Sequence, residues 1–576
     1  MARVANRVGG ICLMTLLAGT AAAEMPAALD RVPADAAVIA SVKNLKNFKD
    51  SITTLGEIIP DLGDNMGMAD LMLGLPGLNA EGSVAMAMMS VDEGLDFDDD
   101  GPMIMIVPVT DYSTLVTGLG GQPSGGIDEF NMHGTVLFSK DIGGGFAAIS
   151  PMNELLSGFD GKAGQLEAHS ARVGKTGQRI GDDSDAFIIF DIEALRPMIE
   201  GQLEEMGQKV EMLAAMAGGA QAEQMQGNIE IAEVMGAAFL RDAQVAMIGL
   251  SVGDPGIGID IGAQFKDGSE LSGYFQANGN APSLLKRLPS EKYLFAFAVD
   301  TSAESTGKLL AKLNELALEH TPDAAKMGGA NPNWLFDHSD GMAMVFGQPA
   351  SLMGGMLTKT AVFAATNNPQ GLVDAHKELS AQLNGQSTQG MTFNTSYQEN
   401  ATEINGTTVD SWTISFKADP NVPGAMQQQQ AMMMAFGPTM GPSGFTAPAE
   451  SGVIFTFSQD ATLMTNALSA AKAGDGLGND AGIASVAEYL PDNASAVVFI
   501  GVANIIDVVG NFAAMMGQPL QIDVPDDLKP IGIGNTTSDG GIRTRMFIPT
   551  DVISAFAQLQ KMGQGGGGDG GEKPRF

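Results

Sequence analysis

One short phrase occurs three times in this chain and constrains its architecture more than any other feature. It spans residues 32–39, 288–295 and 490–498, and each copy places a proline and an acidic residue before an apolar run. A helical pattern follows each copy. A repeated strand–helix unit determines the architecture before any site can be considered. The phrase therefore predicts a repeated supersecondary structure, and we expect no residue within it to belong to a reaction centre.

A fourth, weaker copy at residues 183–190 lacks the proline and indicates how the copies relate to one another. The copies at Pro33 and Pro289 open two halves whose later strand–helix steps come in the same order, whereas the copy at Pro491 corresponds to the weaker one. We therefore predict an α+β fold made by tandem duplication of one unit. Each unit is expected to hold a mixed sheet with helices, in which strand–helix steps alternate with antiparallel meanders.

The expected domains follow from this duplication. The N-terminal α+β lobe spans residues 24–280, and the C-terminal α+β lobe spans residues 281–560. The second lobe carries an insertion near residues 420–448, which has no counterpart in the first lobe and is expected to be partly helical or loose. Residues 561–576 are rich in glycine and have the composition of a flexible tail.

Residues 1–23 have the pattern of a secretory signal peptide. Arg3 and Arg7 precede an apolar stretch shorter than the roughly 20 residues that a membrane helix needs, and small residues lead to a cleavage site after Ala23. The sequence thus predicts a periplasmic or secreted protein with no transmembrane segment after the signal is removed. The single cysteine, Cys12, would leave with the signal, so neither a catalytic thiolate nor a disulfide is expected.

The formal charge of −36 limits the partners of the protein. Nucleic-acid binding depends on Lys and Arg side chains at phosphates, so we do not expect a chain this acidic to bind nucleic acid. The same charge disfavours binding to anionic lipid. Acidity would suit a soluble exported protein, cation binding or a salty habitat, and composition does not separate these three explanations.

The start of the mature chain resembles a known family. The signal peptide is followed by Leu29-Asp30-Arg31-Val32-Pro33-Ala34-Asp35-Ala36, then by a strand and a helix. This layout resembles a family of uncharacterised exported bacterial proteins, a domain-of-unknown-function family. Its members open with a leucine-proline-alanine-aspartate-alanine phrase and return to it. The resemblance implies an envelope location and a large α+β body, and it implies no catalytic residue.

An acidic stretch gives the sharpest local signal for a ligand. Asp96, Asp98 and Asp100 precede Gly101 in the spacing that opens a calcium loop, where alternating carboxylates converge on a hard cation. The twelfth loop position falls on Val107, whose side chain has no ligand oxygen, and the stretch lies between two predicted strands. A solvated acidic hairpin turn is therefore the alternative. Calcium is the one cofactor that the sequence suggests.

The 36 methionines and five histidines indicate structural roles more than metal binding. Exported methionine clusters can hold Cu(I), because thioether sulfur suits a soft ion. Here, Met86 and Met88 share one face of a predicted strand, and Met103 and Met105 share one face of the next. Core packing is therefore the role that we expect for the clusters, of which residues 432–434 form the third. The histidines form no pair with metal-ligand spacing, and we expect His376 on the surface of a helix.

These patterns favour a non-catalytic exported envelope protein that acts as a binding or scaffold protein. Its partner would be an unknown envelope protein or a small ligand. Two alternatives stay open. One is a carrier of an apolar ligand between the two lobes, where methionine-rich walls would adapt to the ligand. The other is an extracytoplasmic hydrolase that uses acids such as Asp98 or Asp183. The sequence leaves enzymatic activity undecided and favours its absence, because no nucleophile–base pattern is present.

Overall fold

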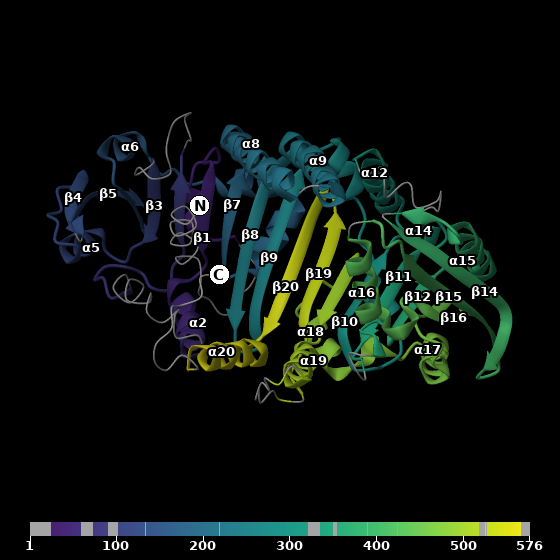
Figure 1. The fold of residues 1–576 in the computed structure, drawn as a ribbon. Coiled ribbons are helices and arrows are strands. Elements are labelled where there is room, and N and C mark those ends of the chain that lie inside the picture. The colour runs from purple at the N-terminus through teal and green to yellow at the C-terminus, as the bar shows by residue number, and fades with distance from the viewer. Residues whose placement is uncertain are drawn as a thin grey trace. The chain divides into compact units, whose positions relative to one another are not determined.

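The chain forms two compact units, whose elements Figure 1 labels. The computed structural model describes residues 25–58, 73–89, 102–132, 134–217, 219–320, 334–349, 354–388, 390–422, 424–515, 517, 525 and 527–565. The first unit comprises Met1–Glu204, Ala238–Gly273 and Ser538–Phe576; the second comprises Glu205–Ala237 and Tyr274–Thr537. Residues 538–560 thus belong to the first unit, whereas the sequence analysis placed them in the C-terminal lobe.

The first unit is built on one antiparallel sheet. Its strands, in spatial order, are β4 (Ile127–Met132), β5 (Thr135–Gly143), β6 (Phe146–Ser150), β3 (Met103–Pro108), β2 (Val84–Met88), β1 (Val38–Val42), β7 (Ala186–Asp191), β8 (Ala243–Gly253), β9 (Gly256–Phe265) and β20 (Gly541–Pro549). Its helices are α2 (Leu45–Ile58), α5 (Tyr112–Gly118), α6 (Asn153–Gly158), α7 (Leu166–Asp183), α10 (Glu270–Tyr274) and α20 (Thr550–Gly565).

The α+β class is confirmed, but the expectation of a mixed sheet is wrong for the strands that the structure describes. The strand–helix steps suggested parallel neighbours, because a parallel pair needs a crossover connection. Instead, β2, which follows α2 in the chain, pairs with β1 in antiparallel register. Strand β1 then lies between β2 and β7 and pairs with both in antiparallel register.

The repeated phrase leads into β1 as expected, and α7 holds it in place. The backbone oxygen of Val32 accepts a hydrogen bond from His169 Nε2 at 2.8 Å. Arg172 Nη1 donates to the backbone oxygens of Ala34 at 2.6 Å and Ala36 at 3.2 Å. These bonds satisfy carbonyl groups that enter the core before any strand partner is available to them. The phrase is therefore a turn into a strand, in which Val32 and Ala36 are buried and Asp35 is exposed.

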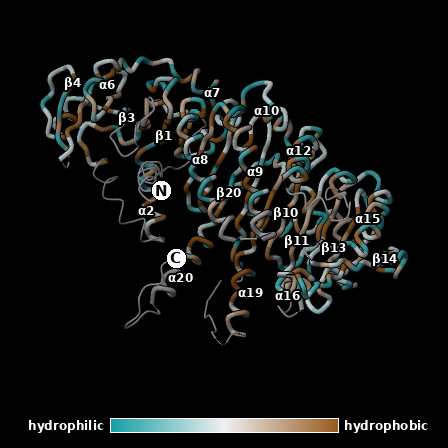
Figure 2. The backbone as a smooth tube through the Cα atoms, turned by 45° about the horizontal axis from the view of Figure 1, so that its top comes forward, coloured by the Kyte–Doolittle hydropathy of each residue, from teal (hydrophilic) through white to brown (hydrophobic). Residues whose placement is uncertain are grey.

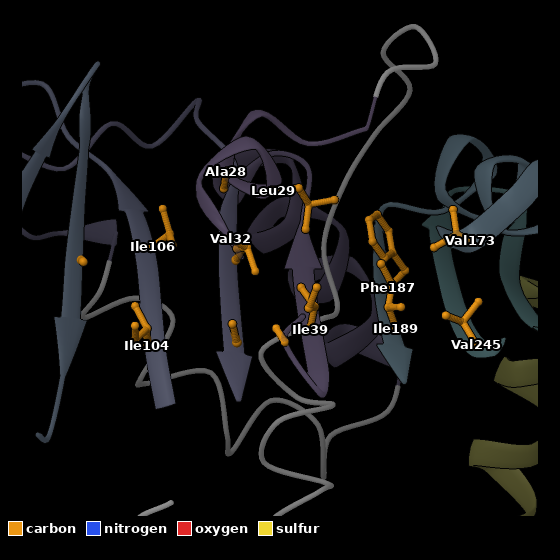
Figure 3. Packing of buried hydrophobic residues seen from close by; sticks show 14 of the residues in the cluster. Ala28, Leu29, Val32, Ile39, Ile104, Ile106, Val173, Phe187, Ile189 and Val245 are labelled. Atoms are coloured by element: carbon orange, nitrogen blue, oxygen red, sulfur yellow. The ribbon is translucent and has the colours of Figure 1, made fainter. Parts of the chain in front are cut away.

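The core of the first unit lies between α7 and the sheet (Figure 3). Ile39 and Phe187 on the strands are buried with Val173 and Ile180 of α7. Helix α7 approaches the sheet closely because glycine stands beneath it: a Cβ added at Gly262 would lie only 2.6 Å from Ile180 Cδ1. The strands under this helix thus need small residues on this face.

The second unit is also built on an antiparallel sheet. Its strands, in spatial order, are β13 (Ser387–Thr388), β14 (Met391–Ile404), β15 (Thr407–Ala418), β16 (Ser443–Ala449), β17 (Gly452–Thr456), β12 (Thr360–Ala365), β11 (Gly341–Gly347), β10 (Tyr293–Asp300), β18 (Ala496–Ile500) and β19 (Ile531–Ser538). Its helices are α11 (Ala281–Leu285), α12 (Glu304–His320), α14 (Trp334–Asp337), α15 (Pro369–Leu383), α16 (Ala425–Phe436), α17 (Ala461–Ala473), α18 (Ala481–Ala487) and α19 (Val502–Met515).

Local turn chemistry places several of these elements where the sequence predicts them. Asp111 is the N-cap of α5 and accepts a hydrogen bond from the backbone N–H of Thr114 at 2.6 Å. Asn405 and Gly406 join β14 to β15 with φ angles of 53° and 75°, in the left-handed region that a tight hairpin turn requires. The segment near residues 420–448 is helical in part, as α16, and its end forms strand β16 of the sheet.

The long helical region from residue 192 is interrupted where the sequence predicts it, between α8 (Ile192–Ala217) and α9 (Gly219–Asp242). A membrane-spanning helix would need both length and a nearly continuous apolar sequence. None of the helices in the described ranges combines the two.

Candidate functional site

The predicted calcium ligands Asp96, Asp98 and Asp100 lie outside the described residues. The strands on either side of them pair with each other, since Met88 of β2 lies opposite Met103 of β3. The acidic stretch therefore joins two adjacent antiparallel strands, as the sequence expects. Within the described ranges, no group of three His, Asp or Glu side chains is arranged to hold a metal ion. Calcium binding stays a prediction.

His376 corrects another expectation, because it is buried and not on the surface. It lies on α15, stacks on Trp334 with ring centroids 5.4 Å apart and meets Trp412 edge to face at 5.3 Å. Its Nδ1 lies 3.1 Å from the hydroxyl oxygen of Thr446. Burial lowers the pKa of His376 to about 4, so this ring is neutral at pH 7. The charged residues near His376 in the sequence suggested an exposed position. Its burial becomes evident only when α15 is seen to pack against the sheet.

The first unit presents an apolar surface that the sequence analysis did not identify. We call it the isoleucine row: Ile188 on β7, Ile248 on β8 and Ile261 on β9 are direct neighbours across the strands. Ile188 is buried, but Ile248 is 39% exposed and Ile261 is 58% exposed. Large aliphatic side chains in the middle of a sheet are normally covered by other elements. The exposed isoleucines of this row therefore form an uncovered apolar surface.

Both ends of the strands that carry the isoleucine row are covered by other elements. At one end, Leu55 of α2 and Ile553 of α20 are buried with Val252 of β8. At the other end, the ring of Phe239 meets that of Phe265 edge to face at 5.9 Å. The exposed isoleucines lie between these covered ends, in strands held by neighbours on both sides.

The second unit has a comparable feature. Phe295 on β10 is 41% exposed and lies directly opposite Phe346 of β11 on one side and Ile500 of β18 on the other. Figure 2 shows hydrophobic residues concentrated along α19, where Val509 and Phe512 are also exposed. Each unit, considered by itself, therefore leaves apolar side chains uncovered.

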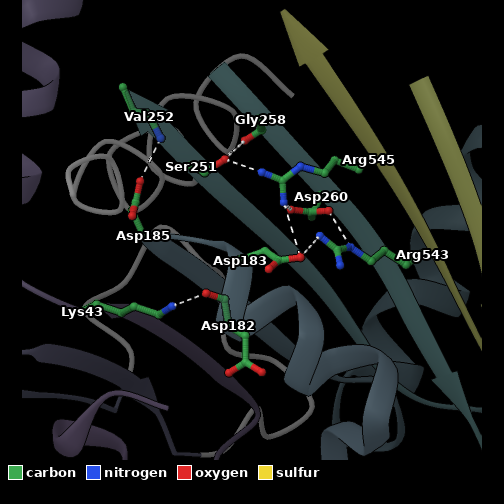
Figure 4. A network of polar contacts seen from close by, with 10 residues as sticks. All are labelled: Lys43, Asp182, Asp183, Asp185, Ser251, Val252, Gly258, Asp260, Arg543 and Arg545. Atoms are coloured by element: carbon green, nitrogen blue, oxygen red, sulfur yellow. Dashed lines mark hydrogen bonds and ion pairs between the residues drawn. The ribbon is translucent and has the colours of Figure 1, made fainter. Parts of the chain in front are cut away.

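A buried ion-pair network lies on the opposite face of the strands that carry the isoleucine row (Figure 4). Asp260 of β9 is fully buried and adjoins Ile261 in the chain, so the two side chains point to opposite faces. Arg543 Nε donates to Asp260 Oδ1 at 2.7 Å, and Arg545 Nη1 donates to Asp260 Oδ2 at 3.0 Å. Asp183 Oδ2 lies 2.7 Å from Arg543 Nη2. Two carboxylates thus balance two guanidinium groups.

These contacts determine what the acidic groups can do. Burial raises the pKa of Asp260, while the two guanidinium groups act in the opposite direction. Burial also raises the pKa of Asp185 to about 6, against a hydrogen bond from the backbone N–H of Val252. Asp183, which the sequence suggested as a catalytic acid of a hydrolase, forms an ion pair with Arg543. The network joins β20 and α7 to β9.

The methionine clusters divide into two groups. Met86 and Met105 lie opposite each other on β2 and β3 and are half-buried, which agrees with a packing role. Met433 and Met434 on α16 are 48% and 59% exposed, so the expected core role is wrong for these two. Helix α16 turns them outward because its core-facing side is occupied by Ala425.

No protein-family model, no curated protein and no solved structure matches this chain.

Proposed function

We propose that the chain arose by tandem duplication of one α+β unit. The order of strand pairing supports this: β1 lies between β2 and β7, and β10 lies between β11 and β18. Strand β2 then continues through β3 to β6, and β11 continues through β12 to β17. Two unrelated sheets would not be expected to share so long an order of non-sequential neighbours.

The helices support the same proposal. Helix α5 follows β3 as α15 follows β12, α6 follows β6 as α17 follows β17, and α8 follows β7 as α19 follows β18. Among the described residues, two strands lie between β3 and β6 in the chain, whereas four strands and α16 lie between β12 and β17, where the insertion was predicted. On this proposal, β9 and β20 are the closing strands of the two copies.

We further propose that the protein is exported and acts as a non-catalytic binding protein for an apolar ligand. The observation that carries this is the exposure of Ile261 and Ile248 in the middle of a well-paired sheet. Complete burial of an exposed aliphatic side chain contributes about 1.5–3 kcal/mol, and covering the 39% of Ile248 and the 58% of Ile261 that are exposed would contribute the corresponding part of it. The ion-pair network behind them keeps this face in place, because β20 is joined to β9 by charged hydrogen bonds as well as by backbone pairing.

Binding of a fluorescent fatty acid tests the proposed ligand class. Wild-type protein is expected to bind the probe, and native mass spectrometry is expected to show a co-purified apolar molecule. Ile261→Thr keeps a β-branched side chain while removing apolar surface, and we expect about five- to tenfold weaker binding, equivalent to about 1–1.4 kcal/mol. Val136→Thr on β5 is the matched control, since Val136 is also an exposed β-branched residue but lies outside the row. Equal weakening in both variants, or no probe binding by wild type, contradicts the proposal.

Export is tested separately from ligand binding. The mature chain is expected to begin at Glu24 and to accumulate in the periplasm or the medium, because the signal pattern ends at Ala23. Intact-mass measurement of the fractionated protein decides this. A full-length chain that stays in the cytoplasm contradicts the proposed location.

A further inference from the structure

Five asparagines of this chain stand in the pattern Asn-x-Ser/Thr, the acceptor sequence for N-linked oligosaccharides in exported proteins. They are Asn394, Asn400, Asn405, Asn493 and Asn535. The pattern is short, so the surroundings of each asparagine decide whether it can serve. A usable acceptor needs an exposed asparagine and an exposed hydroxyl two residues later, because the transferring enzyme recognises both.

Burial of the hydroxyl argues against two of the five positions. Ser495 and Thr537 are the hydroxyl residues of the patterns that begin at Asn493 and Asn535, and both are buried. Their side-chain oxygens lie 3.2 Å apart, within hydrogen-bond distance of each other. These two hydroxyls therefore belong to the interior of the second unit and are out of reach of an enzyme.

Two further positions are less accessible than their exposure suggests. Asn394 lies in the regular part of β14, where its backbone oxygen accepts a hydrogen bond from the hydroxyl of Ser415 at 3.3 Å. The regular ladder keeps this segment flat in the sheet. Asn405 lies in the turn between β14 and β15, but its Nδ2 atom is 3.4 Å from Ser469 Oγ on α17. The amide that would accept the sugar is thus directed toward a helix.

Asn400 differs because it lies in a bulge of β14. Residues 399–401 stand opposite the single residue Asp410 of β15, so the strand bends outward at this point. The φ angle of Asn400 is 49°, in the left-handed region that asparagine tolerates better than most residues. Asn400 and Thr402, the asparagine and the hydroxyl of the pattern, are both exposed.

Side chains on both sides of the bulge hold it in shape. Asp410 Oδ1 accepts a hydrogen bond from the backbone N–H of Asn400 at 2.8 Å, and Asp410 Oδ2 accepts one from the hydroxyl of Tyr397 at 2.7 Å. Glu399 forms an ion pair with Lys377 of α15. The backbone around Asn400 is therefore fixed, while its side chain is exposed.

The hairpin also leaves room for a bulky group at this place. Strand β16 pairs with β15 only over Asp410–Thr413, and β13 pairs with β14 only at Met391 and Thr392. Among the described strands, the outer part of the hairpin thus has no third strand beside it, and Figure 1 shows β14 at the edge of the second unit. An open strand edge can pair with another chain. A sugar on Asn400 would hinder such pairing.

We propose that Asn400 is an acceptor site for an N-linked oligosaccharide. In the transfer, Asn400 Nδ2 forms a bond to the anomeric carbon of the sugar, and the bond from that carbon to a polyprenyl diphosphate oxygen breaks. The diphosphate leaves with the bonding electrons, and the amide releases one proton. The co-reactant is thus a lipid-linked oligosaccharide, and the partner is a membrane-bound transferase. This inference rests on the proposed export, because such transfer takes place outside the cytoplasm.

Intact-mass measurement of the exported chain, produced with its signal peptide in its native cells, tests the site. Wild-type protein is expected to exceed the mass of residues 24–576 by one oligosaccharide. Asn400→Asp tolerates the same φ angle but lacks the amide nitrogen, and we expect it to lose the added mass completely. Thr402→Ala should also lose it, whereas Thr402→Ser keeps the hydroxyl and should retain it. Asn405→Asp is the matched control, since Asn405 is exposed on the same hairpin with a φ angle of 53°, and it should retain the added mass.

The outcomes separate this inference from the proposed export. A wild-type chain that is cut after Ala23 but carries no added mass overturns the inference and leaves export supported. A chain that keeps its signal and stays in the cytoplasm contradicts export and the inference together. Loss of the added mass in Asn405→Asp but not in Asn400→Asp overturns the choice of Asn400. Loss in both Thr402→Ala and Thr402→Ser also overturns it, because the hydroxyl would then not be what the enzyme recognises.

Discussion

Acidification should destabilise the second unit through one buried histidine. Burial lowers the pKa of His376 to about 4, whereas a histidine in the unfolded chain titrates near about 6.5. The unfolded state therefore binds the proton more readily between these two values. The stability contributed by the neutral ring is fully present above pH 6.5 and is lost as the pH falls toward 4. The full difference of about 2.5 pKa units corresponds to about 3 kcal/mol, of which about 2 kcal/mol is lost by pH 5.

Urea unfolding followed by tryptophan fluorescence measures this effect directly. Trp334 and Trp412 both contact the His376 ring, so the emission reports on the unit that contains it. We expect His376→Gln to lose about 2 kcal/mol less than wild type between pH 7 and pH 5, whatever its stability at pH 7. Carboxylates that titrate over the same range contribute equally to both proteins and cancel. His338→Gln is the control, since His338 is exposed and should leave the pH dependence unchanged. The same loss in wild type and His376→Gln would refute the reasoning.

Three further substitutions test other parts of the structure. Asp260→Asn removes the carboxylate that two buried guanidinium groups share and should lower the free energy of unfolding by about 3–5 kcal/mol. The control Asp254→Asn, at an exposed position, should change the free energy of unfolding by less than about 0.5 kcal/mol. Denaturant titration that finds equal losses in the two variants contradicts the role of the network. Gly262→Ala should cost about 1–3 kcal/mol, because its Cβ would meet Ile180, while Gly273→Ala has open space and serves as the control in the same thermal melts. Calorimetric titration should show calcium heat in wild type that is lost in Asp98→Ala, and a wild type without calcium heat ends the calcium hypothesis.

Local residue patterns predicted many of the helices and strands, but few of the strand pairings. The Asn405–Gly406 turn and the Asp111 cap were identifiable because their chemistry acts within a few residues. The antiparallel pairing of β1 with β2 and β7 could not be identified from the sequence. A strand–helix step has the same sequence pattern whether the next strand runs parallel or antiparallel to the first.

The candidate surfaces were hidden for a related reason. Alternation along β9 distinguishes the two faces of the strand, but it does not show that Ile261 lacks a covering element. His376 lies between charged residues on its helix, and only the sheet beneath α15 buries it.

The position of β20 has a consequence for how the protein is made. Asp260 and Arg543, which hold β9 to β20, are separated by 283 residues, and β20 begins only at Gly541. A growing chain therefore cannot complete the sheet of its first unit until β20 has been synthesised, however early that unit began to form. Pairing over such a separation is slow, because loop closure must precede the contacts that stabilise it. The first unit would thus stay incompletely folded until β20, which ends at Pro549, has been synthesised.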